Sequence, residues 1–185
     1  MTFTKEENKR GRDFLEEIGL KKIDRFVCVI VRDSAYKDQV QSWIKRDWSY
    51  HNYRDSDITN YIMAAEELAE RGYFAIRMGA KVHEAIKSDH PKVIDYATNG
   101  MRSDFMDIYL SANCTFMISS GTGICEVARM CRRPMVYVNI VPIISNQSSR
   151  KEIIILYKKH IRVKDGKELT QNEIFEMGVG YSHST

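Results

Sequence analysis

The chain lacks the features that mark secreted, membrane-spanning or metal-binding proteins. Its first residues, MTFTKEENKRGRDF, contain no apolar segment of the kind found in a secretory signal, and no apolar run approaches the length of a membrane span. The four cysteines do not have the spacing of a metal site, which favours buried, reduced thiols in a cytoplasmic protein. We therefore expect no metal and no resident cofactor.

An excess of charge of one sign is also missing. The 185 residues include 28 basic and 25 acidic side chains, which gives a net charge of +3. This balance does not favour a nucleic-acid partner, although it would not repel an anionic ligand. Neither an internal repeat nor a low-complexity tract is present. With 43% hydrophobic residues, the sequence predicts a single domain over residues 1–185, with a frayed tail at 179–185.

Short apolar runs alternate with segments of helical spacing along the chain. The runs that predict strands are residues 26–31, 73–78, 93–97, 116–118, 135–138 and 153–157. The segments that predict helices are residues 5–19, 58–72, 103–112, 124–133 and 170–177, and several begin with a capping residue such as Thr4, Ser103 or Thr170. This alternation predicts a doubly wound, mostly parallel, Rossmann-like α/β sheet.

The stretch 115–139, TFMISSGTGICEVARMCRRPMVYVN, has the pattern of strand, small-residue turn, helix and strand. Such a turn presents free backbone N–H groups at a helix start, hydroxyl donors, and glycines that allow close approach, which suits a phosphate. The spacing matches neither the Walker A pattern nor the dinucleotide fingerprint, and an ordinary strand-to-helix turn would look similar. The candidate phosphate-binding residues are Ser119, Ser120, Gly121, Thr122 and Gly123.

Two arginines follow predicted strands at their carboxyl ends. Ligands of open parallel sheets bind in the crevice beyond these ends, at the point where the strand order reverses. We expect that crevice between the strands ending at Val31 and Ser119, so that Arg32 and the turn 119–123 face one cleft. Arg32 and Arg77 together could grip a diphosphate, whereas the alternative for Arg32-Asp33-Ser34 is a loop salt bridge.

Residues 35–57 form a long connection in which aromatic and basic residues are interleaved. Both tryptophans of the chain, Trp43 and Trp48, lie here. Aromatic faces beside cations suit stacking on a base or sugar while phosphate is held, and Tyr53 is a candidate for contact with the ribose or base. The alternative is a local helix over about residues 38–46 whose aromatics fill the side of the core.

The same region contains candidates for a general base and for a metal ligand. Asp33 and His51 could serve as the base by position, but a loop hydrogen bond is the alternative for each. Asp55-Ser56-Asp57 resembles the acidic motif that holds a metal and a nucleotide diphosphate in some sugar transferases. Because a helical pattern begins at residue 58, we interpret Ser56 or Asp57 as its N-cap instead.

Several strings in this sequence resemble a family of bacterial glycosyltransferases associated with surface-polysaccharide gene clusters. The strings are VIVRDSAY, YHNYRDSDITNYIMAAEELAERGYFAIRMG, VIDYA, RSDFMDIYLSANCTFMISSGTG and RRPMVYVN, and the similarity spans about residues 11–178. More distantly, the arrangement resembles the C-terminal, donor-binding half of GT-B-type glycosyltransferases, including the fucosyltransferase-like ones. The resemblance implies that Arg32 and residues 119–123 hold the diphosphate of a nucleotide sugar, and that Glu126 is the candidate for the ribose hydroxyls.

A complete GT-B enzyme has two Rossmann-like halves, and this chain has room for one. The resemblance therefore implies a donor-binding domain of a metal-independent, Leloir-type glycosyltransferase whose acceptor half is missing. A glycan or lipid-linked acceptor would then be bound by another domain or a partner chain, in the cytoplasm or at the inner membrane face. The alternative is a non-catalytic module that binds a nucleotide or sugar phosphate.

Overall fold

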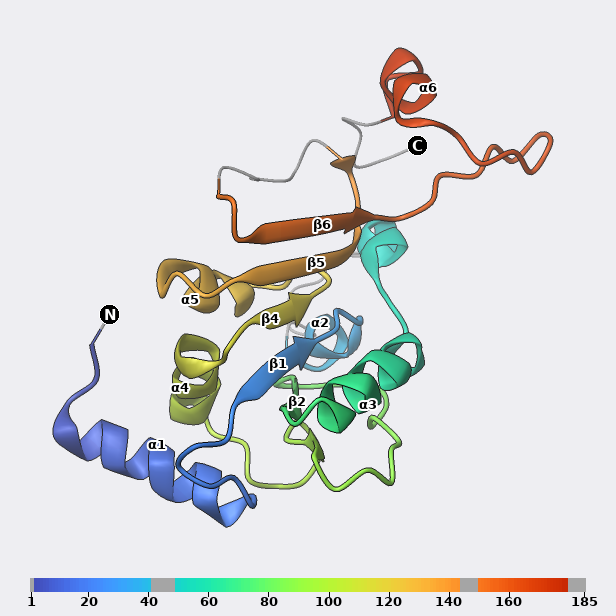
Figure 1. The fold of residues 1–185 in the computed structure, drawn as a ribbon. Coiled ribbons are helices and arrows are strands. Elements are labelled where there is room, and N and C mark those ends of the chain that lie inside the picture. Colours follow the sequence, from blue (N-terminus) through green and yellow to red (C-terminus); the bar gives the residue numbers. More distant parts are fainter. Residues whose placement is uncertain (1, 41–48, 144–149, 180–185) are drawn as a thin grey trace.

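Six parallel strands form one sheet whose order reverses between its two central strands (Figure 1). A computed structural model describes residues 2–40, 49–143 and 150–179. The strands are β1 (Phe26–Ile30), β2 (Phe74–Met78), β3 (Val93–Asp95), β4 (Met117–Ser119), β5 (Met135–Ile140) and β6 (Ile153–Tyr157), in the order β3-β2-β1-β4-β5-β6. This arrangement confirms the predicted doubly wound fold and puts the switch point between β1 and β4, as expected.

Most of the helices lie between strands in sequence, whereas α1 precedes β1 and α6 follows β6. They are α1 (Lys5–Glu17), α2 (Ala35–Val40), α3 (Ile62–Glu70), α4 (Asp104–Asn113), α5 (Cys125–Met130) and α6 (Gln171–Glu176), with 3-10 helices η1 (Ser49–Arg54) and η2 (Ile58–Tyr61). Thr4 and Thr170 form the predicted capping boxes of α1 and α6, and the Ser103 hydroxyl accepts from the Met106 amide at the start of α4. No helix in the described ranges is long and apolar enough to span a bilayer.

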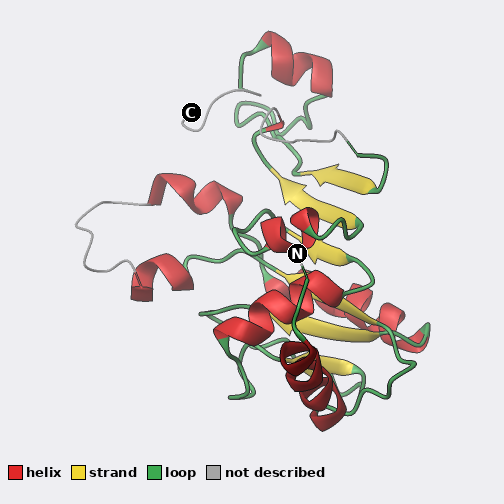
Figure 2. Cartoon of the chain, turned by 90° about the vertical axis from the view of Figure 1, so that its left-hand side faces the viewer, coloured by secondary structure: helices red, strands yellow, loops and turns green. Residues whose placement is uncertain are grey.

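Helices cover both faces of the sheet (Figure 2). Side chains alternate along each strand, so Cys28 and Ile30 of β1 face one core cluster while Val27 and Val29 face the other. Helices α1, α4 and α5 pack on the first face, and η2 with α3 packs on the second. β1 and β2 are buried on both faces, and this explains why β1 is a continuous apolar run and β2 has only Arg77 as a polar residue.

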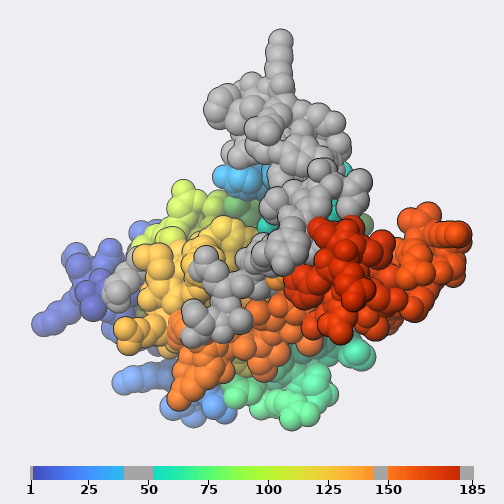
Figure 3. All heavy atoms as spheres, turned by 90° about the horizontal axis from the view of Figure 1, so that it is seen from above, coloured from blue at the N-terminus to red at the C-terminus, as the bar shows by residue number. Residues whose placement is uncertain are grey.

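After β6 the chain extends to one side of the molecule, where α6 lies (Figures 1 and 3). The predicted turn at Asp165-Gly166 is present, with Gly166 at φ 69° and its amide donating to the Arg162 carbonyl over 2.8 Å. Arg162 and Lys167 both form ion pairs with Glu173 of α6. These contacts tie the last helix to the turn before it.

Three local predictions need correction. The helix after the 119–123 turn ends at Met130 rather than near residue 133, because Arg132 adopts a left-handed conformation at φ 57°. The predicted helix at 58–72 begins with a 3-10 turn, η2, which Asp57 caps by accepting from the Thr59 amide. In the long connection, α2 begins at residue 35 instead of 38, and residues 41–48, including Trp43 and Trp48, lie outside the described residues.

Candidate functional site

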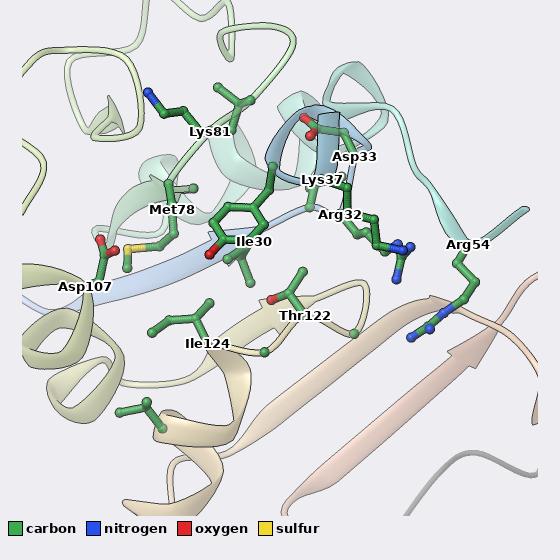
Figure 4. Close-up of a pocket in the computed structure, with 18 residues that line it drawn as sticks. Ile30, Arg32, Asp33, Lys37, Arg54, Met78, Lys81, Asp107, Thr122 and Ile124 are labelled. Carbon is green, nitrogen blue, oxygen red and sulfur yellow. The ribbon is translucent and has the colours of Figure 1, made fainter. Parts of the chain in front are cut away.

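A cavity of about 590 Å³ opens at the carboxyl ends of β1, β2 and β4, over the switch point (Figure 4). Its walls come from the end of β1 and the following loop, from α2, from residues 78–82 after β2, and from residues 121–124 after β4. Three separate loops and one helix therefore meet at the place where open parallel sheets bind ligands. The volume lies within the range of small-molecule sites.

Arg32 and the turn after β4 are hydrogen-bonded to each other. The Arg32 amide donates to the Ser120 hydroxyl over 2.7 Å, and the Ser120 amide donates to the Ile30 carbonyl over 3.2 Å. The Ser119 hydroxyl accepts from the Gly121 amide over 3.1 Å. Both serines are buried: the Ser120 hydroxyl joins the two loops, the Ser119 hydroxyl holds its own turn, and the cavity is lined instead by residues 121–123.

The turn itself brings backbone close to the cavity. Gly121 has φ 81°, and a Cβ there would lie 3.3 Å from the Ile140 side chain, so this position favours glycine. Gly123 faces open space, and the buried Thr122 hydroxyl has no hydrogen-bond partner in the described part of the chain. Since α5 has only six residues, its macrodipole adds little, and the phosphate seat predicted here rests on the loop.

Four cationic side chains gather around one carboxylate at one side of the cavity. Arg32 Nε lies 2.9 Å from Asp55 Oδ1, and Lys37 and Arg54 line the same cavity. Figure 4 shows the side chains of Arg32 and Arg54 beside the loop that carries Thr122. Lys158 of the segment after β6 donates to the Asp55 carbonyl over 2.6 Å and so fixes the loop that presents this pair.

Burial and mutual repulsion lower the pKa values of three of these cations. Burial lowers the pKa of Arg54, and the charge of Arg32 lowers it further. Burial and then the Arg32 charge also lower the pKa of Lys37. The pKa of Lys158 is lowered by burial against the opposing effect of Asp55. Asp55 opposes these shifts in Lys37 and Arg54 but does not compensate for their burial, so this side of the cavity favours an anion.

Arg77 does not join this group. Side chains at consecutive strand positions point to opposite faces, so Met78 lines the large cavity while Arg77 lies on the α3 face of β2. Arg77 is 1% exposed and donates to the Glu84 carbonyl over 3.1 Å. The structure thus does not bring Arg77 and Arg32 together into the diphosphate clasp that the sequence suggested.

The other predicted site residues lie at or beyond the rim. Both oxygens of Asp33 accept backbone hydrogen bonds, from the Ala35 amide at 3.0 Å and the His83 amide at 3.1 Å, and its carboxylate points away from Thr122 in Figure 4. Glu126 forms an ion pair with Arg129 along α5 and does not line the cavity. Neither does Tyr53, whose carbonyl accepts from Lys158. His51 belongs to η1, and its side chain lies outside the described residues.

Sequence reasoning missed three residues that line the cavity. Lys81 follows β2, where the strand-end rule could have found it. Arg54 was noticed only as part of the aromatic and basic segment. Asp107 of α4 forms an ion pair with Arg102, but its Oδ1 is buried without a partner among the described residues, and no motif marks it. Within the described ranges, no three potential metal ligands cluster.

No family model and no curated protein matches this sequence. Two solved structures match this chain. The ADP-heptose LPS heptosyltransferase II of E. coli superposes with a TM-score of 0.51 at 13% identity, covering 95% of this chain and 51% of that one. This is the fold of one half of a GT-B glycosyltransferase. An E. coli heptosyltransferase with ADP-2-deoxy-2-fluoro heptose gives a TM-score of 0.45 at 14% identity, covering 90% of this chain and 46% of that one. The chain thus spans about half the length of each.

Proposed function

We propose that this chain binds a nucleoside diphosphate sugar in the large cavity, as the donor-binding domain of a glycosyltransferase for surface polysaccharide or other glycans. The observation that supports the proposal best is the cluster of Arg32, Lys37 and Arg54 around Asp55 at the switch point. An anion that bears more than one charge would relieve the repulsion among these cations. A diphosphate has that charge, and guanidinium groups bind its oxygens in bidentate fashion.

The rest of the cavity suits the remainder of such a ligand. Its wall away from the cations is largely apolar, with Ile30, Met78 and Ile124 available for the faces of a base or sugar. The unpartnered Oδ1 of Asp107 could accept a hydrogen bond from a ribose hydroxyl or a base amino group, the role that the resemblance assigned to Glu126. The position of Asp107 in the cavity supports it over Glu126.

The proposed chemistry depends on charge. In glycosyl transfer the bond from the anomeric carbon to the diphosphate oxygen breaks, and the leaving diphosphate gains negative charge. Arg32, Arg54 and the backbone N–H groups near Gly121 would stabilise that charge from fixed positions, which is effective where water is excluded. In this proposal, side chains supply the positive charge that a divalent metal supplies in other transferases.

The acceptor would be bound elsewhere. Because the chain spans about half of the heptosyltransferase structures, we propose that a further domain or a partner chain binds a glycan or lipid-linked acceptor and supplies the general base. Such a protein would work in the cytoplasm or at the inner membrane face. A non-catalytic nucleotide or sugar-phosphate module is the alternative, and it would bind the donor without transferring sugar even when an acceptor half is provided.

Isothermal titration calorimetry with UDP-, GDP-, CDP- and ADP-sugars tests the proposal. Arg32→Ala and Arg54→Ala should each weaken binding by about tenfold or more, because a hydrogen bond to a charged group contributes roughly 1.5–3 kcal/mol. Arg71→Ala is the matched control, since Arg71 is exposed and pairs with Glu67 on α3. The proposal fails if no nucleotide sugar binds, or if the control weakens binding as much as Arg54→Ala does.

A further inference from the structure

A second, smaller cavity of about 170 Å³ adjoins the large one. The two share Val31 and Asp33, but the small cavity lies on the opposite face of β1 and β2, beneath the start of η2. Its other lining residues include Ser56, Arg77 and His83. A ligand that fills the large cavity therefore has a polar recess beside it at the carboxyl end of β1.

Arg77 lines this recess, and part of its guanidinium has no hydrogen-bond partner in the described residues. The side chain is 1% exposed, and burial lowers its pKa. One nitrogen donates to the Glu84 carbonyl, and Nη1 lies 3.8 Å from Asp95 Oδ1, beyond hydrogen-bond distance. Nε and Nη1 have no hydrogen-bond partner in the described part of the chain. Buried polar groups in folded proteins are almost always paired, so these two donors call for an acceptor.

Ser56 presents a second unused group. Its hydroxyl is buried and has no hydrogen-bond partner among the described residues. Its backbone amide donates to the Arg32 carbonyl over 2.9 Å, so the position of Ser56 is tied to the loop that carries Arg32, the proposed diphosphate ligand. The hydroxyl is both a donor and an acceptor, and it lies in a recess about as large as five or six waters at roughly 30 Å³ each.

The charge of the recess differs from that of the large cavity. Asp33, Asp57 and Glu84 line it together with Arg77, whose charge is already opposed by Asp95. A second phosphate would be repelled by these carboxylates. A neutral group with several hydroxyls fits, because it can accept from Arg77 and donate to carboxylate oxygens, which retain acceptor capacity after one hydrogen bond each.

We propose that the small cavity receives hydroxyl groups of the sugar whose diphosphate lies in the large cavity. Arg77 and Ser56 would donate to the sugar hydroxyls, and Asp33, at the boundary of the two cavities, would accept from one of them. The inference rests on the proposed function, and it gives Arg77 a role in recognising the sugar instead of the diphosphate. The basic side of the large cavity matches the charged diphosphate of a nucleotide sugar, and the carboxylate-rich small cavity matches its neutral sugar.

Paired calorimetric titrations test this assignment. The probes are UDP-glucose, GDP-mannose and ADP-glucose, each compared with its free nucleoside diphosphate. Ser56→Ala should weaken the affinity for the sugar nucleotide that binds by about two- to tenfold, which is the loss of one hydrogen bond. The affinity for the free nucleoside diphosphate should stay within about twofold of the unaltered protein. Arg77→Lys, which retains the buried charge next to Asp95 but loses the planar fork, should have the same selective effect.

Ser111→Ala is the matched control, because Ser111 is fully buried in α4, its hydroxyl has no partner in the described ranges, and it lines neither cavity. It should change neither affinity, and thermal melting should show that all three variants fold. The inference is overturned if Ser56→Ala changes the affinities for sugar nucleotide and diphosphate equally, or changes neither. The recess would then hold only water. If the unaltered protein binds neither class of probe, the proposed function itself fails.

Discussion

The backbone amide of Arg32 lies 2.7 Å from the hydroxyl oxygen of Ser120, a residue 88 positions later in the chain. This bond joins the loop after β1 to the loop after β4 at the switch point of the sheet. The reverse contact, from the Ser120 amide to the Ile30 carbonyl, extends the β1–β4 pairing by one step. The two loops that carry the candidate diphosphate site therefore form one rigid unit.

Ser120→Ala should destabilise the fold. The change removes the acceptor of the Arg32 amide in a region where Ser120 is only 4% exposed, and an unsatisfied buried donor costs about 1–3 kcal/mol. Chemical denaturation of the two proteins measures the difference. Ser111→Ala, which removes a buried hydroxyl that has no partner within the described ranges, should cost clearly less. Equal losses for the two variants would mean that the Arg32–Ser120 bond has no special weight.

The fold could be predicted from the sequence because its strands are buried on both faces. The run at β1 is continuous and apolar, the run at β2 is interrupted only by Arg77, and the capping residues Thr4, Ser103 and Thr170 mark helix starts unambiguously. The strand-end rule then put Arg32 and Ser120 in one cleft. What failed locally was the length of α5, which ends at Met130, two residues before a left-handed Arg132 that propensities do not indicate.

The site was harder to predict because side-chain direction decides it. Arg77 and Met78 are neighbours at the carboxyl end of β2. Because consecutive side chains of a strand point to opposite faces, Met78 lines the large cavity and Arg77 does not. Asp107 enters the cavity from the first turn of α4, where an acidic residue is common at any helix start, so no local motif identifies it. Ser119 and Ser120 were predicted as ligand donors, and the structure uses their hydroxyls within the loops.

Nucleotide binding should take up protons at alkaline pH. The pKa of Lys37 is lowered in the folded protein, so its charge begins to be lost below the usual lysine value of about 10.4. Below the lowered pKa the lysine is charged with or without ligand, and no uptake occurs. Near and above that pKa, a bound diphosphate favours the charged form and draws a proton back. Apparent affinity should therefore fall as pH rises through this range.

Calorimetry of UDP binding in buffers of different ionisation enthalpy, at about pH 7 and about pH 9.5, measures this uptake. Lys37→Met should reduce the uptake at the higher pH, whereas Lys9→Met should not, because Lys9 is an exposed residue of α1 paired with Asp13. Identical proton uptake in both variants would show that Lys37 does not face the ligand.

The capping box of α6 should loosen in acid. Lys167 and the Thr170 backbone lower the pKa of Glu173 to about 2. Because the folded pKa is below the unfolded one, the stabilisation is complete above the ordinary glutamate value of about 4.3 and is lost as pH falls towards about 2. Amide exchange in α6 at decreasing pH follows the loss. Glu173→Gln should remove this pH dependence, and Glu168→Gln, which breaks only the pair with Lys159, should retain it.

Gly11→Ala should destabilise the packing of α1 on α4 despite the higher helix propensity of alanine. A Cβ at this position would lie 2.1 Å from Cζ of Tyr109, whose ring is 4% exposed. The ring cannot move aside freely, because Phe3 and Phe105 pack against it with centroids at 5.1 and 5.8 Å. Relieving such a clash costs about 1–3 kcal/mol, which outweighs the propensity gain of about 1 kcal/mol.

Gly123→Ala meets open space and should leave the unfolding free energy nearly unchanged. Thermal or denaturant unfolding decides the sign, and a more stable Gly11→Ala variant would show that the ring does yield.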